Sequence, residues 1–465
     1  MFKTVATAAK ELSVESYVVG GYVRDLMLGR ACKDIDFVCV GDGIALAHKV
    51  ASLIKPSPEV HIFRNYGTAM LRHEEWELEF VGARKESYTR HSRNPKVEQG
   101  TLEDDQKRRD FTINAFAISL NDESYGDLLD PFGGLNDLKN KIIRTPTDPE
   151  KTFSDDPLRM MRAIRFASQL NFDIEPITFE AIQKNKERIT IVSKERISAE
   201  LNKIILSEKP SYGFKLLYHS GLLSIIFPEL AALQGVETID NKSHKDNFYH
   251  TLQVLDNVAK ESDSLWLRWA ALLHDIAKPA TKRFDPKVGW TFHGHEEIGA
   301  RMVPKIFSRL RLPQNEHMRK VVNLVRLHLR PIALVSDHVT DSAIRRLLFE
   351  AGDDYEDLMI LCRADITSKN NSKVERYLAN FKKVEQKITD VEQRDMLRNF
   401  QPVLTGNDIM NLFGLSPGKK VGDIKTALRE AILEGEINNT MEAAQDFVIR
   451  FAKKMYNLDP VKKTS

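Results

Sequence analysis

Cysteine is scarce in this sequence of 465 residues, which contains only Cys32, Cys39 and Cys362. The three residues form neither a paired framework nor a C-x-x-C metal motif. This scarcity excludes a small secreted scaffold held by disulfides and indicates a reducing compartment.

Long apolar runs and an excess of charge are also missing. No apolar stretch reaches the ~20 residues that a membrane-spanning helix needs. The N-terminal segment contains Lys and Glu and lacks the apolar core of a signal peptide, so we predict a cytoplasmic protein that does not contact a membrane. The 68 basic residues nearly balance the 66 acidic ones, for a formal net charge of +2. Any binding of nucleic acid must therefore use local basic surfaces.

The length and apolar content of the chain are sufficient for several domains. Hydrophobic residues make up 42% of the sequence, as in an ordinary globular protein. Since single cores stop growing near roughly 250–300 residues, we expect three or four domains. Short β-like runs alternate with helical patterns through residues 17–144, whereas a helical period dominates from Thr152 onward, which predicts an α+β fold class. The expected β runs are Tyr17–Val19, Ile35–Val40, Gly67–Leu71, Trp76–Val81 and Thr112–Leu120, and the expected domains are 1–145, 146–238, 239–385 and 386–465.

The segment YVVGGYVRDLMLG places an apolar run directly before Gly20 and Gly21 and a helical pattern after them. A strand, a tight turn and a helix N-terminus expose backbone N–H groups, and paired glycines let a triphosphate approach them closely. Arg24 would lie in the first helical turn as a partner for phosphate charge. For this segment alone, a purely structural Gly-Gly turn is the alternative.

Ten residues further on, the segment KDIDFVCV places Asp34 and Asp36 at the start of an apolar strand. Residues i and i+2 of a strand share a face, so both carboxylates point the same way. This pairing of like charges is unfavourable unless a cation lies between them, and oxygen ligands suit Mg²⁺ held jointly with substrate phosphates. Two such ions could activate an attacking hydroxyl and stabilise a leaving pyrophosphate. Two solvated residues at a strand end are the alternative.

The pattern Gly-Gly-x-x-Arg-Asp followed by Asp-x-Asp resembles the first motif of the class II tRNA nucleotidyltransferases, or CCA-adding enzymes, and of the related bacterial poly(A) polymerases. The similarity continues through most of residues 17–230. It implies an N-terminal polymerase-β-like nucleotidyltransferase domain with a mixed sheet and helices, followed by an all-α neck and body. It also implies tRNA, CTP and ATP as partners.

The resemblance implies roles for further residues. Glu79, in ELEFVGARKESY ahead of Arg84, matches an acidic strand residue that would be a third metal carboxylate; a solvent-facing Glu is the alternative. The segment YTRHSRNP resembles the family's mobile loop, in which Arg93 would help to order the substrate.

The segment KRRDFTINAFAI is a rarer string that also matches the family. Arg108 and Arg109 would pair with the triphosphate, and Asp110 would bind a ribose hydroxyl or support the metal site. The sequence leaves open which arginine faces inward. Apolar residues alternate from Phe111 to Ala117 in the manner of a strand, which predicts that part of the motif is core.

The segment TFSDDPLRMMRAIRFASQL predicts a helix beginning near Pro157. Cytosine and adenine each present an exocyclic amino donor beside a ring-nitrogen acceptor, whereas guanine and uracil present the opposite order. A carboxylate beside a guanidinium would therefore accept CTP and ATP and reject GTP and UTP. An N-cap followed by a surface arginine ladder is the alternative. The related enzymes open this pattern with Glu-Asp, where this chain has Asp155-Asp156. The residues that would share one helix side are Asp156, Arg159, Arg162 and Arg165.

A second constellation is rich in histidine, since 8 of the 13 histidines lie between His244 and His338. Imidazoles and carboxylates at separated helix positions could converge on a divalent cation. The order His, His-Asp, Asp resembles the HD phosphohydrolase superfamily, and two further histidines match its two-metal versions. This resemblance implies a divalent transition metal or Mg²⁺ and possible hydrolysis of a phosphoester; satisfied core histidines are the alternative. The predicted ligands are His250, His274, Asp275, Asp365, His295 and His328.

The segment from Leu404 to Ile437 resembles the C-terminal tRNA-contacting region of the same enzymes, with Lys419 and Lys420 at a helix start where they would bind backbone phosphate. Solvated lysines in a helix–turn–helix connection are the alternative. The sequence as a whole predicts a tRNA nucleotidyltransferase that adds CCA, or part of it, with Mg²⁺ and without a template. A poly(A) polymerase or an enzyme adding only A or only CC is one alternative, and a phosphohydrolase with an RNA-binding N-terminal module is another. The oligomeric state stays open.

Overall fold

The structure is a computed structural model that describes residues 1–64, 67–89, 92–240, 242–334, 340–367, 371–395 and 401–461. Its contacts divide the chain into two compact units. One unit is Met1–Gln234 with Arg309–Leu312, and the other is Gly235–Ser308 with Pro313–Ser465. The predicted division into four domains stays a prediction. Among the helices of the described residues, none has the length and apolar content to cross a bilayer.

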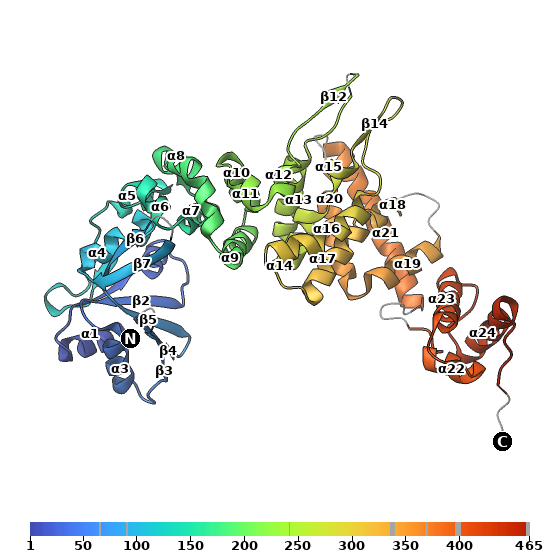
Figure 1. Cartoon of the computed structure of the whole chain (residues 1–465), viewed down its shortest axis with the longest axis horizontal. Coiled ribbons are helices and arrows are strands. Elements are labelled where there is room, and N and C mark those ends of the chain that lie inside the picture. The colour runs from blue at the N-terminus through green and yellow to red at the C-terminus, as the bar shows by residue number, and fades with distance from the viewer. Residues whose placement is uncertain are drawn as a thin grey trace. The chain divides into compact units, whose positions relative to one another are not determined.

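The N-terminal unit is built on a seven-stranded mixed sheet, which confirms the α+β fold class (Figure 1). The strand order is β3-β4-β5-β2-β1-β8-β9. The β2–β5 pair is parallel, and the other neighbours are antiparallel. The strands are β1 Ser16–Val19, β2 Asp34–Cys39, β3 Val60–Phe63, β4 Thr68–His73, β5 Trp76–Gly82, β8 Ala117–Ser119 and β9 Leu128–Leu129.

The two faces of the central strand β2 differ in chemistry because successive side chains point to opposite sides. Phe37 lies on the face packed by the helices, where its ring stacks on Phe80 with centroids 5.0 Å apart. Asp34 and Asp36 lie on the other face together with Val38, which belongs to a smaller buried cluster. The helices of this part are α1 Phe2–Glu11, α2 Gly21–Met27, α3 Gly43–Leu53, α4 Leu102–Lys107 and α5 Gly134–Asn140, with a 3-10 turn at Asp122–Ser124.

The remainder of this unit is helical, as the 3.6-residue period predicts. The helix expected near Pro157 is α7, which runs from Leu158 to Leu170 and packs mainly on α9. It ends at Asn171, whose left-handed φ of 56° stops the helix. The other elements are β10 Ile142–Ile143, α6 Pro149–Asp155, β11 Asp173–Ile174, α8 Pro176–Asn185, a 3-10 helix Lys186–Ile191, α9 Lys194–Ile205, α10 Pro210–His219, α11 Leu222–Ile226 and α12 Pro228–Ala231.

The strand predicted over Thr112–Leu120 is largely wrong. Residues Thr112–Asn114 form a 3-10 helix, and β8 covers only Ala117–Ser119. The apolar alternation misleads because both sides of the segment are covered: Thr112 and Asn114 are buried as well, and the Thr112 hydroxyl donates to Asp137 at 2.7 Å. Alternation of apolar and polar residues identifies a strand when only the apolar face is buried. Here the polar residues are buried too, so the alternation does not identify a strand.

Of the segment expected as a mobile loop, the described residues 88–89 and 92–95 belong to two paired strands, β6 Arg84–Thr89 and β7 Ser92–Gln99. The side chain of Arg93 lies outside the described residues, so its predicted role stays a prediction.

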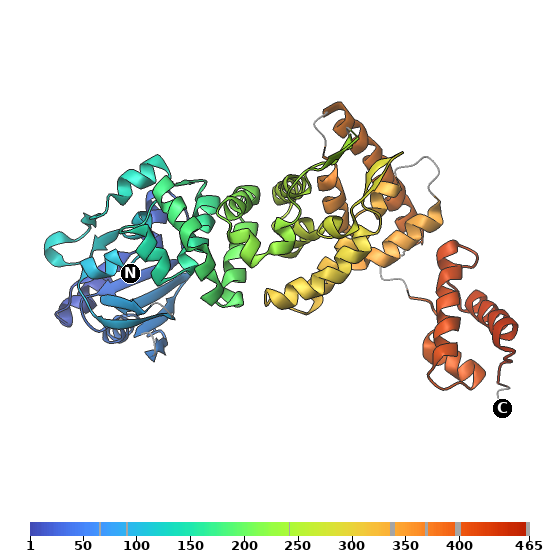
Figure 2. The same ribbon diagram turned by 45° about the horizontal axis from the view of Figure 1, so that its top comes forward.

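The second unit consists of helices with two small hairpins, as Figure 2 shows from a second direction. The hairpins are β12 Thr238–Ile239 with β13 Lys242–Ser243, and β14 Arg283–Asp285 with β15 Gly289–Thr291. The helices are α13 Asn247–Glu261, α14 Leu265–Leu273, α15 Lys278–Thr281, α16 His295–Arg309, α17 Glu316–Leu327, α18 Arg330–Ala333, α19 Asp341–Ala351, a 3-10 helix Gly352–Asp354, α20 Tyr355–Asp365, α21 Asn371–Asp395, α22 Gly406–Phe413, α23 Lys419–Glu434 and α24 Met441–Tyr456.

Candidate active site

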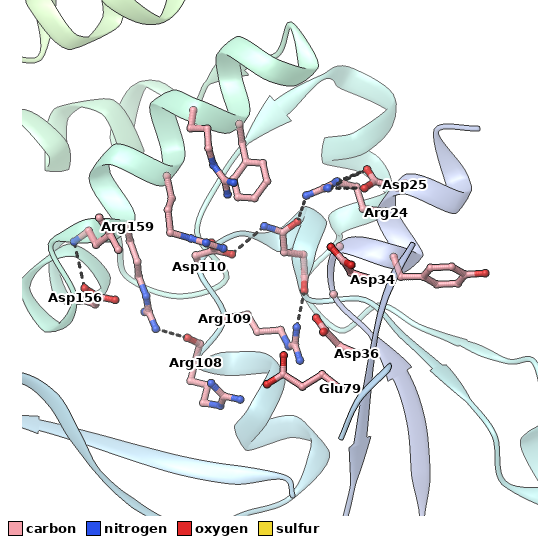
Figure 3. Close-up of a pocket in the computed structure, with 18 of the residues that line it drawn as sticks. Arg24, Asp25, Asp34, Asp36, Glu79, Arg108, Arg109, Asp110, Asp156 and Arg159 are labelled. Atoms are coloured by element: carbon pink, nitrogen blue, oxygen red, sulfur yellow. Dashed lines mark hydrogen bonds and ion pairs between the residues drawn. The ribbon is translucent and has the colours of Figure 1, made fainter. Parts of the chain in front are cut away.

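A cavity of about 570 Å³ opens where the β1–α2 turn, β2, β5 and the first turns of α7 meet. It is lined by every residue of the N-terminal unit that the sequence assigned to catalysis or nucleotide binding. These residues are Gly20, Gly21, Arg24, Asp34, Asp36, Glu79, Arg108, Arg109, Asp110, Asp156, Arg159, Arg162 and Arg165. Figure 3 shows most of them pointing into one space.

Three carboxylates form one end of the cavity. Asp34 and Asp36 share a face of β2, and the parallel register places Glu79 of β5 opposite Asp36. Burial raises the pKa of Asp36 and the nearby Arg109 lowers it, while the charge of Asp34 adds to the rise. Burial and the charge of Asp36 also raise the pKa of Glu79. Mutually repelling oxygen donors on one wall fit a divalent cation such as Mg²⁺.

The turn before α2 tolerates only glycine at its first position. Gly20 has a left-handed φ of 77°, and a Cβ there would lie 2.7 Å from a guanidinium nitrogen of Arg109. The absent side chain lets Arg109 lie directly over the turn beside Asp36 (Figure 3).

Arg24 lines the cavity, but its guanidinium already has protein partners. It donates to both carboxylate oxygens of Asp25 at 2.9 Å and to the side-chain oxygen of Asn114 at 2.7 Å. Its guanidinium also lies 4.9 Å from the ring centre of Phe166. Arg24 therefore connects α2 to the segment that follows α4.

The sequence alone identifies Asn114 only as part of a segment with alternating apolar residues. Its amide nitrogen donates to Asp110 at 2.9 Å, and the other Asp110 oxygen accepts from Arg162 of α7 at 2.7 and 2.6 Å. A continuous chain of bonds thus runs from Arg24 through Asn114 and Asp110 to Arg162. These bonds fix the position of α7, which would read the base, relative to β1, the glycine turn and α2, which would hold the phosphates.

Asp105 is a second residue that the sequence reading missed. It is fully buried and pairs with Arg108 and Arg109, accepting from Nε of Arg108 at 3.0 Å and from Nη2 of Arg109 at 3.0 Å. Burial alone would raise its pKa, but the two guanidinium groups lower it below its usual value. Both arginines line the cavity, so neither faces away. The i+3 and i+4 spacing in DDQKRR is the signal that could have identified Asp105.

Asp110 should make the stability of the protein depend on pH. Burial alone would raise its pKa, but Arg162 and Asn114 hold that pKa at about 2. Because the folded pKa is depressed, its contribution is present above about pH 4 and is lost as pH falls toward 2. We expect Asp110→Asn to lower the free energy of unfolding by about 2 kcal/mol at pH 7. At pH 3 this difference in unfolding free energy between wild type and variant should be smaller by about 1 kcal/mol.

Urea unfolding of both proteins at the two pH values would measure this gap. Asp127→Asn, which removes an exposed carboxylate of the same unit, is the matched control and should show no comparable change. A gap that stays constant with pH would contradict the assignment.

The predicted base-reading pair lies at the other end of the cavity from Asp34 (Figure 3). Asp156 lies just before α7, whose N-cap is Pro157, and accepts from the Leu158 amide at 3.2 Å. Arg159 donates to the backbone oxygen of Arg108 at 2.6 Å. Both side chains still line the cavity, which leaves an acceptor and donors side by side.

Arg165 differs from the other arginines of α7. Its Nε lies 2.9 Å from a carboxylate oxygen of Glu200 on α9, and its guanidinium lies 4.0 Å from the centre of the Phe166 ring. The contact with Glu200 joins α7 to α9, the helix against which it packs.

The second constellation also comes together, at the ends of α13, α14, α16, α17 and α20. Nε2 of His250 lies 2.9 Å from Asp365 and 3.4 Å from Asp275. Nε2 of His274 and of His295 each lie 3.3 Å from an Asp275 oxygen. Ligand atoms lie within 4.8 Å of one another in two sets, His250 with His274 and Asp275, and Asp275 with His295 and His328. Asp275 belongs to both sets.

Backbone carbonyls orient three of these histidines. Nδ1 of His274, His295 and His328 lies 2.7 Å from the carbonyl oxygens of Ala271, Phe292 and Val325. This contact places the proton on Nδ1 and leaves the Nε2 lone pair facing the centre, as in metal-ligating histidines. All three Nε2 atoms are buried without a hydrogen-bond partner among the described residues. Buried Nε2 lone pairs without a hydrogen-bond partner are available to bind a divalent cation.

Two lysines flank this histidine–aspartate site. Nζ of Lys278 lies 2.6 Å from Asp275 Oδ2. Lys245, which the sequence reading missed, lies 3.3 Å from Nδ1 of His250 and donates to the Thr367 hydroxyl at 2.6 Å. By contrast, Lys419 and Lys420 are exposed at the start of α23 and line neither site, so their contact with RNA stays a prediction.

Family models match most of the chain. The Poly A polymerase head domain matches residues 16–144, and the "probable RNA and SrmB-binding site of polymerase A" matches 171–234. The HD domain matches residues 247–370, and the "tRNA nucleotidyltransferase domain 2 putative" matches 357–448. The first match contains the carboxylates and the Arg108–Asp110 segment but ends before Asp156, and the third contains the whole histidine–aspartate set. Both domain types imply dependence on divalent metal.

Relatives of known name align with this chain over most of the length of both proteins. The A-adding tRNA nucleotidyltransferase of Deinococcus radiodurans is 34% identical over 76% of this chain and 80% of its own. The CC-adding tRNA nucleotidyltransferase of Thermus thermophilus is 30% identical over 94% and 93%. The multifunctional CCA protein of Nitrosococcus oceani is 33% identical over 77% and 86%.

Solved structures show the same fold. The Bacillus stearothermophilus CCA-adding enzyme in complex with CTP aligns over 98% of both chains with 23% identity and a TM-score of 0.67. A tRNA nucleotidyltransferase complexed with a primer tRNA and an incoming ATP analogue aligns over 82% of this chain and 98% of that one, with 25% identity and a TM-score of 0.58. With the carboxylate-and-arginine cavity and these relatives, the chain belongs to the tRNA nucleotidyltransferases and is an enzyme of that family.

Proposed function

We propose that this protein adds CCA to the 3′ end of tRNA from CTP and ATP, without a nucleic acid template. The observation that carries the proposal is a single cavity with carboxylates at one end and the Asp156–Arg159 pair at the other. One acceptor–donor pair complements both cytosine and adenine, so the same pocket can serve both nucleotides. The named relatives include A-adding, CC-adding and multifunctional CCA enzymes, which makes the range of added nucleotides the point to test.

We propose Mg²⁺ as the cation at Asp34, Asp36 and Glu79. When bound, it supplies positive charge that favours an ionised attacking hydroxyl and a leaving pyrophosphate. The chain's own residues position the nucleotide. Arg108 and Arg109, which both pair with Asp105, face the triphosphate. Asp110, held by Asn114 and Arg162, lies between the phosphate and base ends of the cavity, where a ribose would lie.

The product ladder on truncated tRNA tests the proposal. With tRNA ending before CCA, we expect two added residues from CTP alone and three from CTP with ATP. With tRNA ending in CC, we expect one added residue from ATP alone. A ladder that stops at CC in the presence of ATP, or addition of A alone, would replace CCA addition by a partial activity. Long A tails on oligo(A) would indicate a poly(A) polymerase.

The histidine–aspartate site favours a second activity, the metal-dependent hydrolysis of phosphoesters. The observation is two groups of candidate ligands, five residues in all, that share Asp275, with Asp365 2.9 Å from His250. Such a set suits a divalent transition metal or Mg²⁺. We expect His274→Ala with Asp275→Ala to abolish hydrolysis of bis(p-nitrophenyl) phosphate, and EDTA to abolish it in the wild type. Nucleotide addition should be unchanged, because these residues lie outside the first cavity.

His317→Ala is the matched control, since this partly exposed histidine of the same unit belongs to neither ligand set. Hydrolysis that persists in the double variant would exclude this site as its source. Absence of hydrolysis in wild type with Mg²⁺, Mn²⁺, Co²⁺, Ni²⁺ and Zn²⁺ would leave the cluster a structural metal site.

We propose that the remaining segments serve tRNA binding in the cytoplasm. In this division, residues 1–145 are catalytic, 146–238 carry the base reader, 239–385 form the HD region, and 386–465 contact tRNA through Lys419 and Lys420. The similarity of residues 357–448 to a tRNA nucleotidyltransferase domain supports the last assignment.

A further inference from the structure

Some of the side chains that line the catalytic cavity also contact one another in a closed ring. They come from α2, from the segment that follows α4, and from α7. All but Arg162, which is partly exposed, are buried. The ring therefore joins three segments that are far apart in the sequence. Its members, in order of contact, are Arg24, Asn114, Asp110, Arg162 and Phe166.

Hydrogen bonds form the first route around this ring, from α2 to α7 (Figure 3). Arg24 donates to the side-chain oxygen of Asn114 at 2.7 Å, and the amide nitrogen of Asn114 donates to Asp110 at 2.9 Å. The other Asp110 oxygen lies 2.6 Å from Nη2 and 2.7 Å from Nε of Arg162. Each donor in this route faces an acceptor, so the bonds hold the two helices in one relative position.

The phenyl group of Phe166 provides the second route. The guanidinium of Arg24 lies 4.9 Å from the centre of this group, and that of Arg162 lies 5.4 Å from it. Cations within about 6 Å of an aromatic centre are attracted to it, and burial strengthens the attraction. Both routes thus end on the same two arginines, so either route can fix α7 relative to α2 when the other is broken.

Asn114 is suited to the first route by the two different ends of its amide. Arg24 can only donate and an ionised Asp110 can only accept, so one orientation of the amide satisfies both neighbours. The backbone oxygen of Asn114 also lies 3.4 Å from Nη1 of Arg109, the arginine over the glycine turn. Both ends of the side chain are thus bonded to protein groups, which indicates a role in positioning and not in binding the nucleotide.

We propose that Asn114 and Phe166 are positioning residues for nucleotide transfer. Together they fix the distance between α7, which would read the base, and α2 with the glycine turn, which would hold the phosphates. A nucleotide whose base is bound at one end of the cavity then has its α-phosphate aligned with the carboxylates at the other end. Misplacement of reacting groups by about 1 Å can cost roughly 10²-fold in rate. The inference rests on the proposed nucleotide addition and names the residues that align its substrate.

Single-turnover incorporation of CTP into tRNA ending before CCA, with the full-length protein, tests the two routes. Asn114→Ala breaks one route and Phe166→Leu the other, so each should lower the maximal rate by only about 3-fold. The double variant loses both routes, and its loss of rate should exceed the product of the single effects by roughly 2- to 150-fold. The half-saturating concentration of CTP should change by less than about 3-fold in all three variants, because neither side chain would bind the nucleotide.

Asn114→Asp is a second variant at the same position, because it keeps the size of the side chain and the acceptor for Arg24. It places a carboxylate against Asp110 and so breaks only the bond to that residue. We expect a loss of rate at least as large as in Asn114→Ala, and the same additional loss when the change is combined with Phe166→Leu.

Asn121→Ala, Phe153→Leu and their combination are the matched controls. Asn121 is a half-buried asparagine hydrogen-bonded to two serines, and Phe153 is a fully buried residue of α6. Neither residue lines the catalytic cavity. Their effects on the maximal rate should multiply to within about twofold, as for sites that share no partners.

Single effects that also multiply in the double variant of Asn114 and Phe166 would overturn the proposal. A rise of about 10-fold in the half-saturating concentration of CTP, or a changed ratio of CTP to dCTP incorporation, would make Asn114 a nucleotide ligand and overturn it as well. A wild type that incorporates no CTP would instead refute the proposed nucleotide addition, so the two failures are distinguishable.

Discussion

Replacing Asp34 and Asp36 together with alanine should reduce nucleotide addition by about 10³-fold or more, because several kilocalories of transition-state stabilisation depend on the cations they would hold. Stability should change little. The pKa of Asp36 is raised in the folded protein by burial and by Asp34, so removing both carboxylates also removes an unfavourable repulsion. Initial rates of CTP incorporation across a Mg²⁺ titration, with thermal unfolding of the same samples, would measure both effects.

Asp122→Ala with Glu123→Ala is the matched control, since both carboxylates are exposed and lie outside the catalytic cavity. Incorporation that survives in the Asp34/Asp36 variant would remove the metal assignment. Glu79→Gln separates the two readings of Glu79: a higher Mg²⁺ requirement supports a third ligand, whereas an unchanged requirement supports a solvent-facing residue.

Replacing Asp156 or Arg159 with alanine should remove base selectivity. Either change should lower kcat/KM for CTP and ATP by about 10²-fold, while the values for UTP and GTP change little, since discrimination comes from buried polar groups that the wrong base leaves unpaired. Arg159 now donates to the Arg108 carbonyl, so binding of a base exchanges one hydrogen bond for another. Single-nucleotide incorporation assays with each of the four nucleotides would measure the four values.

Asp155→Ala is the control for that experiment, because Asp155 precedes Asp156 but does not line the cavity. It also settles the open role of Asp155, where the related enzymes carry Glu. A loss of selectivity in Asp155→Ala equal to that in Asp156→Ala would show that the base is not read by the Asp156–Arg159 pair.

Local sequence determined the features that depend on short-range geometry. The period of two in a strand placed Asp34 and Asp36 on one face, and Gly20 marked a turn that only glycine can form. The period of 3.6 placed Arg159, Arg162 and Arg165 on the side of α7 that lines the cavity, whereas Asp156 lies before the helix in an extended conformation. Each of these inferences involves residues a few positions apart, for which backbone geometry fixes the relative direction of side chains.

Only the tertiary structure decided what joins these local features. The sheet register brought Glu79 opposite Asp36, and Asn114 joined Arg24 to Asp110 through bonds between residues far apart in the chain. The same long-range packing turned Thr112–Asn114 into a 3-10 helix and gathered the histidine–aspartate ligands from the ends of several helices. Contacts of this kind depend on how whole elements pack, and local periodicity carries no information about that packing.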